Sequence, residues 1–395
     1  MFRKKRNKND YVIISFSQPL SKESLWNSGL VPLFLSQITS VLYFEQPQVA
    51  LLSFVKNPFK WIHNYISEKK IVNHRIKGEN IKVIKLFSLF PLYWSNEWSR
   101  KLNNFFLLLQ IRWFIRHYPF KKRIILAYFS NLPSIEIIKS IPAYRLVYHC
   151  VNDISAVPWP NKQTKVQNIR NEITLAKLAD LIITISPYLT KKMKKYNHNV
   201  KMLMNDVVDF EHFNKAIKIS PPKELKNFKR PIVGYVGGIT KLTIDFDLLN
   251  KVALKLPNWS FVIIGPKYDE HPSRKNIIYL GPRYYEEIPK YIAAFDVCII
   301  PHNNNSYIRH SFTMKLFQYL ALGKPVVATD KPLQVYKDYI YLVKNDPDDF
   351  VAALQKALQE KPERKQSRIK LAKDHNWNIR AHEIFNLLIG TKACK

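Results

Sequence analysis

The sequence predicts an α/β protein built from two doubly wound, Rossmann-like domains that face each other across a cleft. Three observations lead to this fold class. The chain has 395 residues, 47% of them hydrophobic, which is enough for two cores of ordinary size. Short apolar runs alternate with helical patterns along most of the chain, as is typical of parallel sheets covered by helices on both faces. A polar segment with two prolines, residues 214–230, separates the halves.

The second half shows this alternation most clearly. The apolar runs predict strands at Ile232–Val236, Phe261–Ile264, Ile277–Leu280, Val297–Ile300, Pro325–Ala328 and Tyr341–Val343. Helical patterns separate most of them, at Asp245–Leu256, Tyr284–Ala294, Met314–Leu322 and Pro347–Glu360. In such sheets ligands bind beyond the carboxyl ends of the strands. Loops starting at Gly237, Gly265, Pro301 and Ser311 follow such ends, so we expect them at one edge.

The first half follows the same logic with a more basic composition. Strands are predicted at Tyr11–Ser17, Ser40–Phe44, Ile81–Phe87, Arg123–Ala127, Arg145–Tyr148 and Leu181–Ile185. Basic helices with interspersed aromatic residues are predicted between them, notably Lys56–Lys70 and Trp98–His117. The predicted domains are residues 1–213, a linker at 214–230, a second domain at 231–367, and a C-terminal helical segment, 368–395, that crosses back to the first domain.

The stretch SFTMKLFQYLALGKPVVATD, Ser311 to Asp330, places a helix directly before a buried strand. At 100° per residue, one helix face is apolar and consists of Leu316, Phe317, Leu320 and Ala321. Lys315, Gln318 and Tyr319 are predicted on roughly the opposite face. Gly323 occupies the position that ends helices, and Pro325 prevents continuation. This helix therefore offers a cation and an amide at the mouth of an α/β unit.

The net charge of +32 is unusual for a protein of this size. Residues 1–200 carry 31 Lys and Arg against 10 Asp and Glu, so the excess is concentrated in the first half. Such a field attracts nucleic acid, anionic lipid surfaces or phosphorylated substrates. No helix-turn-helix, zinc-finger or aromatic RNA-binding pattern accompanies the charge, so nucleic acid is not an expected partner.

Cysteine usage and hydropathy indicate the compartment. The three cysteines, Cys150, Cys298 and Cys394, are far apart and lack metal-site spacing, which argues for a reducing compartment and against structural zinc. No apolar run approaches the 18 residues of a membrane span. The apolar run behind the basic start is too short for a signal peptide. We expect a cytoplasmic protein.

Several segments of the chain are familiar as a set. VGYVGGITKLTIDFDLL (Val233–Leu249), FVIIGP, IIYLGP, FDVCIIPH and SFTMKLFQYLALGKPVV resemble the donor domain of GT-B-fold glycosyltransferases. The group is the large retaining one, glycosyl transferases group 1, which builds bacterial polysaccharides and glycolipids. Weaker similarities are LVYHCVNDIS, EITLAKLADLIITISPYL, NDVVDFEHF and HNWNIRAHEIFNLL. The resemblance covers about Leu146 to the end and is densest over residues 231–330.

This resemblance implies transfer of a sugar from a nucleotide-sugar with retention of configuration. UDP is the expected nucleotide because it is the commonest donor in the group. The implied donor-binding residues are Gly237, Gly238, Lys241, His310, Phe312, Thr313, Met314, Lys315 and Gln318. Lys315 would stabilise the leaving diphosphate and Gln318 would bind ribose hydroxyls. The family usually has two glutamates where this chain has His310 and Gln318. No metal or other cofactor is expected, and no Asp-x-Asp cluster occupies a suitable loop.

The acceptor side is predicted in the first domain. His149 and Asp153 follow a predicted strand and could orient or deprotonate an acceptor hydroxyl, so they join Lys315 as catalytic candidates. A core-facing or capping role for both residues is an equally open alternative. Ser17 and Gln18, at the end of the first strand, are expected to line the acceptor pocket.

The basic first half suits an acceptor held at a membrane. A saccharide or lipid-linked acceptor of bacterial cell-surface polysaccharide synthesis would place the protein peripherally on the inner, anionic face of the cell membrane. Asn96–Arg123 is the first candidate for this contact and Lys191–Tyr196 the second; an ordinary helix with a solvated basic face is the alternative. Two other functions remain open, a nucleotide-sugar epimerase on the same fold and a non-catalytic polyanion-binding protein.

Overall fold

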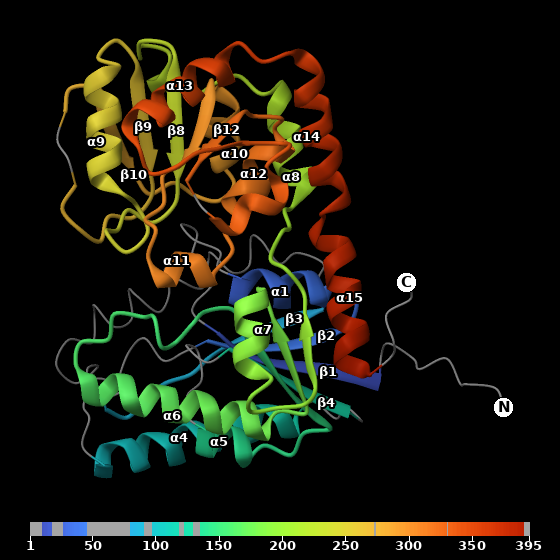
Figure 1. The fold of residues 1–395 in the computed structure, drawn as a ribbon. Helices are drawn as coiled ribbons and strands as arrows, with labels where there is room; N and C mark the ends of the chain where they lie inside the picture. Colours follow the sequence, from blue (N-terminus) through green and yellow to red (C-terminus); the bar gives the residue numbers. More distant parts are fainter. Residues whose placement is uncertain are drawn as a thin grey trace, which may run out of the picture. The chain divides into compact units, whose positions relative to one another are not determined.

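A computed structural model describes residues 10–17, 27–45, 80–90, 97–117, 122–128, 135–271, 274–329 and 331–390. The chain forms two compact units (Figure 1). The first comprises Met1–Met202 with Ala381–Lys395, and the second comprises Leu203–Arg380. The predicted helix Lys56–Lys70 lies outside the described residues. Both units contain a parallel sheet, which confirms the predicted fold class.

The described part of the first unit has a seven-stranded parallel sheet in the order β3-β2-β1-β4-β5-β6-β7. Its strands are β1 (Tyr11–Ser17), β2 (Ser40–Glu45), β3 (Ile81–Lys85), β4 (Lys122–Ala127), β5 (Arg145–Cys150), β6 (Leu181–Thr184) and β7 (Val200–Met202). The strand order reverses between β1 and β4, which is where doubly wound sheets open a crevice at their carboxyl edge. Six of these strands agree with the predicted ones, and the short β7 was not predicted.

Helices connect the strands of this sheet. They are α1 (Asn27–Ser36), α4 (Glu97–Arg116), α5 (Ile135–Lys139), α6 (Lys162–Leu178) and α7 (Pro187–Met193). Two of them begin with a side-chain cap: Asn161 accepts a hydrogen bond from the Thr164 N–H at 2.8 Å, and Ser186 accepts one from the Leu189 N–H. Strand residues such as Ile13, Ile125 and Ile182 are fully buried and form the core.

The second unit has a six-stranded parallel sheet, within the described residues, in the order β10-β9-β8-β11-β12-β13. Its strands are β8 (Ile232–Val236), β9 (Ser260–Ile264), β10 (Ile277–Gly281), β11 (Val297–Ile300), β12 (Val326–Ala328) and β13 (Tyr341–Leu342). All six agree closely with the predicted strands. The order reverses between β8 and β11, so the loops that follow these strands flank the switch point.

The helices of the second unit fall on both faces of this sheet. They are α8 (Phe210–Asn214), α9 (Phe246–Lys255), α10 (Ile288–Ala294), α11 (Ser306–His310), α12 (Lys315–Ala321), α13 (Pro347–Leu358) and α14 (Pro362–Asp374). α9 and α13 pack together over one sheet face, where Leu249, Leu354 and Phe261 share a buried cluster. α12 packs against α8 and α14.

The boundaries of the units differ from the predicted ones. Residues 214–230, predicted as a linker, lie in the second unit. The Asn214 side chain donates a hydrogen bond to the Ala321 carbonyl at 2.9 Å, and Glu224 pairs with Arg283 at 3.2 Å. These contacts hold the segment against the unit despite its polar, proline-interrupted composition.

The predicted C-terminal helix, Arg368–Ile389, is divided in two. α14 ends at Asp374 and α15 (Trp377–Ile389) begins after Asn376, whose side chain accepts a hydrogen bond from the Asn378 N–H at 3.2 Å. The division between the two units falls within α15, after Arg380. Nowhere in the described part of the chain is a helix both long and apolar enough to span a bilayer.

Candidate functional site

The loops after β8 and β9 pack back to back through two glycines. Gly237 has φ of +151° and Gly265 has φ of +148°, conformations that side chains with a Cβ rarely adopt. The Gly237 N–H donates to the Ile264 carbonyl at 2.8 Å. A Cβ on Gly265 would lie 1.9 Å from the Gly237 carbonyl oxygen, so only glycine permits this approach. The sequence therefore builds a tight, open-faced loop at the end of β8.

Lys315 lies against this loop. It is the first residue of α12, and a Cβ on Gly237 would be 2.2 Å from its Cε and 3.0 Å from its Nζ. The Nζ lies 5.4 Å from the centroid of the Tyr235 ring, a cation–π contact. No carboxylate of the described residues forms an ion pair with Lys315. The glycine loop and an uncompensated cation thus stand together at the carboxyl edge of the sheet.

The orientation of α12 corrects one sequence prediction. Tyr319, predicted on the outer face with Lys315 and Gln318, is fully buried, whereas Gln318 is half-buried. The Tyr319 hydroxyl accepts a hydrogen bond from the Val236 N–H at 3.0 Å. The prediction was wrong because periodicity alone does not show that the last N–H of β8 needs a buried acceptor.

The remaining predicted donor residues lie around this pair at different depths. Gly238 lies near the Tyr268 ring: a Cβ at position 238 would be 3.3 Å from Cε2 of Tyr268. Phe312 is buried, with its ring centroid 6.0 Å from that of Tyr336, while Thr313 and Met314 are half-buried. These residues bring polypeptide backbone to the start of α12, next to Lys315.

Lys241 lies in the turn that follows the glycine loop, and His310 lies at the end of a short helix. The Lys241 side chain is exposed, and its backbone N–H donates to the Asp269 carboxylate at 2.7 Å. His310 is the last residue of α11, a short helix that was not predicted and is capped by Asn305. The adjoining loop is fixed by Asn303, which donates to the carbonyls of Lys241 and Ile244. The side-chain amides of Asn303 and Asn305 therefore fix the conformation of these loops.

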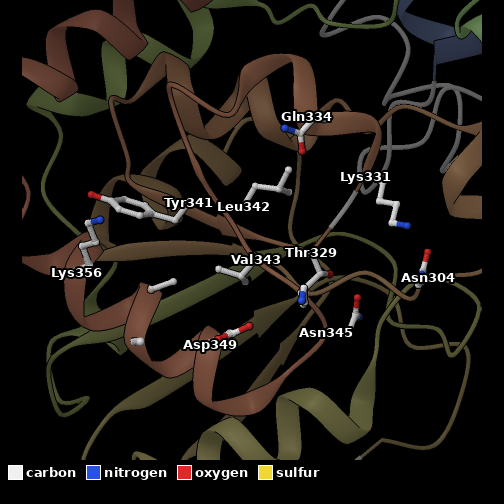
Figure 2. A pocket seen from close by; sticks show the side chains of 13 residues that line it. Asn304, Thr329, Lys331, Gln334, Tyr341, Leu342, Val343, Asn345, Asp349 and Lys356 are labelled. Atoms are coloured by element: carbon white, nitrogen blue, oxygen red, sulfur yellow. The ribbon is translucent and has the colours of Figure 1, made fainter.

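A separate pocket of about 980 Å³ opens beside β12, β13 and α13 (Figure 2). It is lined by Asn304, Thr329, Lys331, Gln334, Tyr341, Leu342, Val343, Lys344, Asn345, Asp349, Ala352, Ala353 and Lys356. In Figure 2, Lys331 and Asn304 lie at the end opposite Tyr341 and Lys356. None of the predicted donor residues lines it, and no local sequence pattern indicates it.

In the first unit, the predicted acceptor residues are buried. Asp153 is 2% exposed and His149 is 5% exposed. The Asp153 carboxylate accepts hydrogen bonds from the Ser155 hydroxyl at 2.6 Å and from Lys192 Nζ at 2.9 Å. Nδ1 of His149 lies 3.1 Å from the Tyr128 hydroxyl. The carboxylate of Asp153 is thus committed to a cation within its own unit.

Lys192 and Glu172 complete this buried cluster and were not singled out from the sequence. Lys192 bridges the two carboxylates, at 2.8 Å from Glu172, and the Tyr148 hydroxyl donates to Glu172 at 2.9 Å. Lys192 lies inside the basic run Lys191–Tyr196, which was read as a candidate membrane contact. Its partners are 39 and 20 residues distant in sequence, so no local pattern could have shown them.

Burial and charge set the protonation of the cluster. Burial raises the pKa of Glu172, against the opposing effect of Lys192. Burial alone would lower the pKa of Lys192. Glu172 and Asp153 together raise this pKa by a larger amount, so the net shift is upward and the ammonium stays charged. Burial also raises the pKa of Cys150 to about 12, which leaves a neutral thiol.

The end of β1 completes the predicted set. Ser17 is the last residue of β1, and Gln18 lies outside the described residues. Within the described ranges, no three His, Cys, Asp or Glu side chains gather as potential metal ligands.

Comparison with known proteins places the chain in a family. Residues 230–360 match the family model described as "Glycosyl transferases group 1". TuaH of Bacillus subtilis (strain 168), which is named as a glycosyltransferase of teichuronic acid biosynthesis, is 30% identical over 278 residues, covering 64% of this chain and 69% of TuaH. The chain belongs to the glycosyl transferases group 1 family. It is a glycosyltransferase, and the predicted family is confirmed.

Solved structures show the same fold in other glycosyltransferases. A sucrose-phosphate synthase from Thermosynechococcus elongatus has a TM-score of 0.66 at 15% identity, with 96% of this chain and 98% of that one covered. Anabaena HepE, solved in complex with UDP and glucose, has a TM-score of 0.64 at 14% identity, with coverages of 97% and 100%. The trehalose-phosphate synthase of Burkholderia xenovorans gives 0.65 at 11% identity, with coverages of 98% and 100%. The glycosyltransferase therefore has the GT-B fold.

Proposed function

We propose that this glycosyltransferase transfers a sugar from a UDP-sugar, bound in the second unit, to a saccharide or lipid-linked acceptor of bacterial cell-surface polysaccharide synthesis. One observation carries the donor proposal: Lys315 lies against Gly237 with no carboxylate partner among the described residues. A diphosphate needs a cation and close backbone approach, and both are present there. The UDP in the HepE complexes and the name of TuaH support the choice of donor and acceptor class.

The proposed chemistry uses few protein groups. The bond between the sugar C1 and the diphosphate breaks, the acceptor hydroxyl oxygen bonds to C1 as its O–H bond breaks, and the leaving diphosphate of UDP takes up both the developing negative charge and the hydroxyl proton. Lys315 stabilises this charge, and Gln318 binds the ribose hydroxyls. His149 and Asp153 are buried against Tyr128 and Lys192, so in this proposal they stabilise the interior of the first unit and do not act on the acceptor hydroxyl. We propose that the sugar keeps its configuration at C1 and that the reaction needs no metal. Both points follow from the resemblance to the retaining group of glycosyltransferases.

The proposed place of action is the inner face of the cell membrane. The acceptor class requires access to a lipid-linked saccharide, and residues 1–200 carry 31 Lys and Arg against 10 Asp and Glu. A surface of this charge is attracted to anionic lipids. The donor and the membrane parts of the proposal depend on different units and can be tested separately.

Thermal stability with UDP, GDP, dTDP and CMP tests the donor site. A nucleotide at 100 times its Kd stabilises the folded state by about 2.7 kcal/mol. UDP should raise the Tm of the wild type, and Lys315→Ala should abolish the effect. Lys356→Ala, in the separate pocket, is the control and should respond to UDP like the wild type. A loss of response in Lys356→Ala alone would move the donor to that pocket.

A further inference from the structure

Helix α4 has a fixed inner face. The buried positions recur every four residues, at Ser99, Asn103, Leu107, Ile111 and Ile115. The Asn103 side chain accepts hydrogen bonds from the N–H groups of Leu89 and Phe90 at 2.9 Å and donates to the Phe90 carbonyl. Seven residues later, about two helical turns, the Gln110 side chain holds Phe87 in the same way. It accepts a hydrogen bond from the Phe87 N–H and donates one to the Phe87 carbonyl. Two amide clamps therefore determine which side of α4 faces outward.

The outward face of α4 carries large apolar side chains in solvent. Trp98 is 64% exposed, Phe105 62%, Leu109 49% and Trp113 57%. Their spacing of seven, four and four residues places them along one stripe, opposite the buried face. Single exposed apolar residues are ordinary, but four along one helix mark a contact surface. In Figure 1, α4 lies at the lower edge of the first unit, where it packs against α5.

Cations flank this stripe. Arg112 and Arg116 are exposed and, by helical position, lie next to Phe105, Leu109 and Trp113. Neither arginine forms an ion pair with any carboxylate in the part of the chain that the structure describes. Lys101 is bound to Glu97 at 2.8 Å, with both side chains 71% exposed. The partner of this face must therefore accept aromatic side chains and supply negative charge.

We propose that this outer face of α4, formed by Trp98, Phe105, Leu109, Trp113, Arg112 and Arg116, is the surface by which the enzyme binds an anionic lipid bilayer. The helix lies flat in the interface, with its aromatic side chains at the headgroup level and its arginines on lipid phosphates. An acidic protein would satisfy the arginines, but it would not explain the tryptophans and phenylalanine as well as an interface does. The inference rests on the proposed membrane location and is independent of the donor.

Cosedimentation of the full chain with vesicles tests the surface. The wild type should bind vesicles that contain phosphatidylglycerol, should bind pure phosphatidylcholine at least tenfold more weakly, and should lose affinity as salt rises. Phe105→Gln with Leu109→Gln removes apolar contact and keeps good helix formers. Arg112→Glu with Arg116→Glu removes and reverses the charge. Each double variant should lower the affinity for anionic vesicles about tenfold or more.

Matched controls lie in the second unit. Leu254→Gln with Leu358→Gln changes two exposed helical leucines, and Lys370→Glu with Lys373→Glu makes the same charge change on α14. Both controls should bind vesicles within about twofold of the wild type. The Tm of each α4 variant and its response to UDP should equal those of the wild type, which separates loss of membrane binding from misfolding and from failure of the donor proposal.

Three outcomes would overturn the assignment. The first is a wild type that does not bind anionic vesicles. The second is α4 variants that bind as the controls do. The third is a wild-type dimer in sedimentation that the α4 variants abolish, because the face would then be a subunit interface.

Discussion

The side chain of Lys315 lies over Gly237, so that a methyl group at Gly237 would stand 2.2 Å from Lys315 Cε. The two residues are 78 positions apart in sequence, yet the position of the Lys315 side chain depends on the absence of a Cβ at Gly237. Glycine leaves the space that the lysine occupies, and the lysine supplies the charge that the open loop lacks. Substitution at either position should therefore change nucleotide binding by the same route.

Gly237→Ala should weaken UDP binding at least tenfold. The added Cβ displaces the flexible Lys315 side chain, and φ of +151° adds about 1–3 kcal/mol of backbone strain. Calorimetric titration with UDP measures the affinity. Gly238→Ala, where the new Cβ comes only within 3.3 Å of Tyr268, is the milder comparison. Equal affinities for the two variants would contradict the proposed placement of the diphosphate.

Tyr319→Phe should destabilise the second unit by about 1–3 kcal/mol. The substitution removes the buried acceptor of the Val236 N–H and leaves that donor without its partner. Urea unfolding followed by circular dichroism measures the loss. Tyr268→Phe, at a 61% exposed position, should change stability by less than about 0.5 kcal/mol. A loss no greater than that of the control would show that the hydrogen bond contributes little.

Lys192→Met should cost the first unit about 3–5 kcal/mol. It leaves the carboxylates of Asp153 and Glu172 in the interior without the cation that compensates them. Differential scanning calorimetry should show a lower melting transition. Adding Glu172→Gln to this variant should recover part of the loss, since one buried charge is removed. If the double variant is less stable than Lys192→Met, the uncompensated charge of Glu172 is not the cause of the loss.

Stability should depend on pH through Asp206. Burial would raise the pKa of this carboxyl, but hydrogen bonds from His375 and Tyr336 and the charge of Arg380 lower it from 3.8 to about 2. Between these values the unfolded state binds more protons, so the free energy of unfolding falls as the solution is acidified. The full effect is about 2 kcal/mol.

His375, the partner of Asp206, should produce the opposite slope at higher pH. Burial lowers its pKa, but Asp206 raises it more, so the net shift is upward from 6.5. Its contribution is complete below about pH 6 and is lost as the pH rises through the folded-state pKa. Melting temperatures of the wild type between pH 2 and 9 should therefore peak between about pH 4 and 6. Asp206→Asn should flatten both slopes; an unchanged profile would assign the pH dependence to other groups.

The sequence was sufficient for elements whose signal is local. Each strand of the second unit was a short apolar run ended by Gly, Pro or a polar residue, and all six were located. The glycine loop and Lys315 were found because the turn after β8 requires glycine and the start of α12 is marked by a motif. These features depend on residues close in sequence.

Features that depend on distant partners were not found. Tyr319 was placed outside because its role is set by Val236, 83 residues away. Lys192 was read as a surface cation because its carboxylate partners lie on other elements. The break between α14 and α15 was missed because the His375 ring bonds to the backbone carbonyl of Asp206, 169 residues earlier. In each case tertiary hydrogen bonding overrode the local pattern.

The second unit begins and ends at one place. Val208 donates its N–H to the His375 carbonyl and accepts from the Trp377 N–H, both at 3.0 Å. The incoming and outgoing chains are thereby tied together, and everything between them forms one uninterrupted stretch of sequence. A single crossover at each end of the gene segment for residues 203–380 would exchange the whole second unit, with its proposed donor site, and leave the rest of the polypeptide unaltered. Under the proposed function, a change of donor would need only this one replacement of residues 203–380.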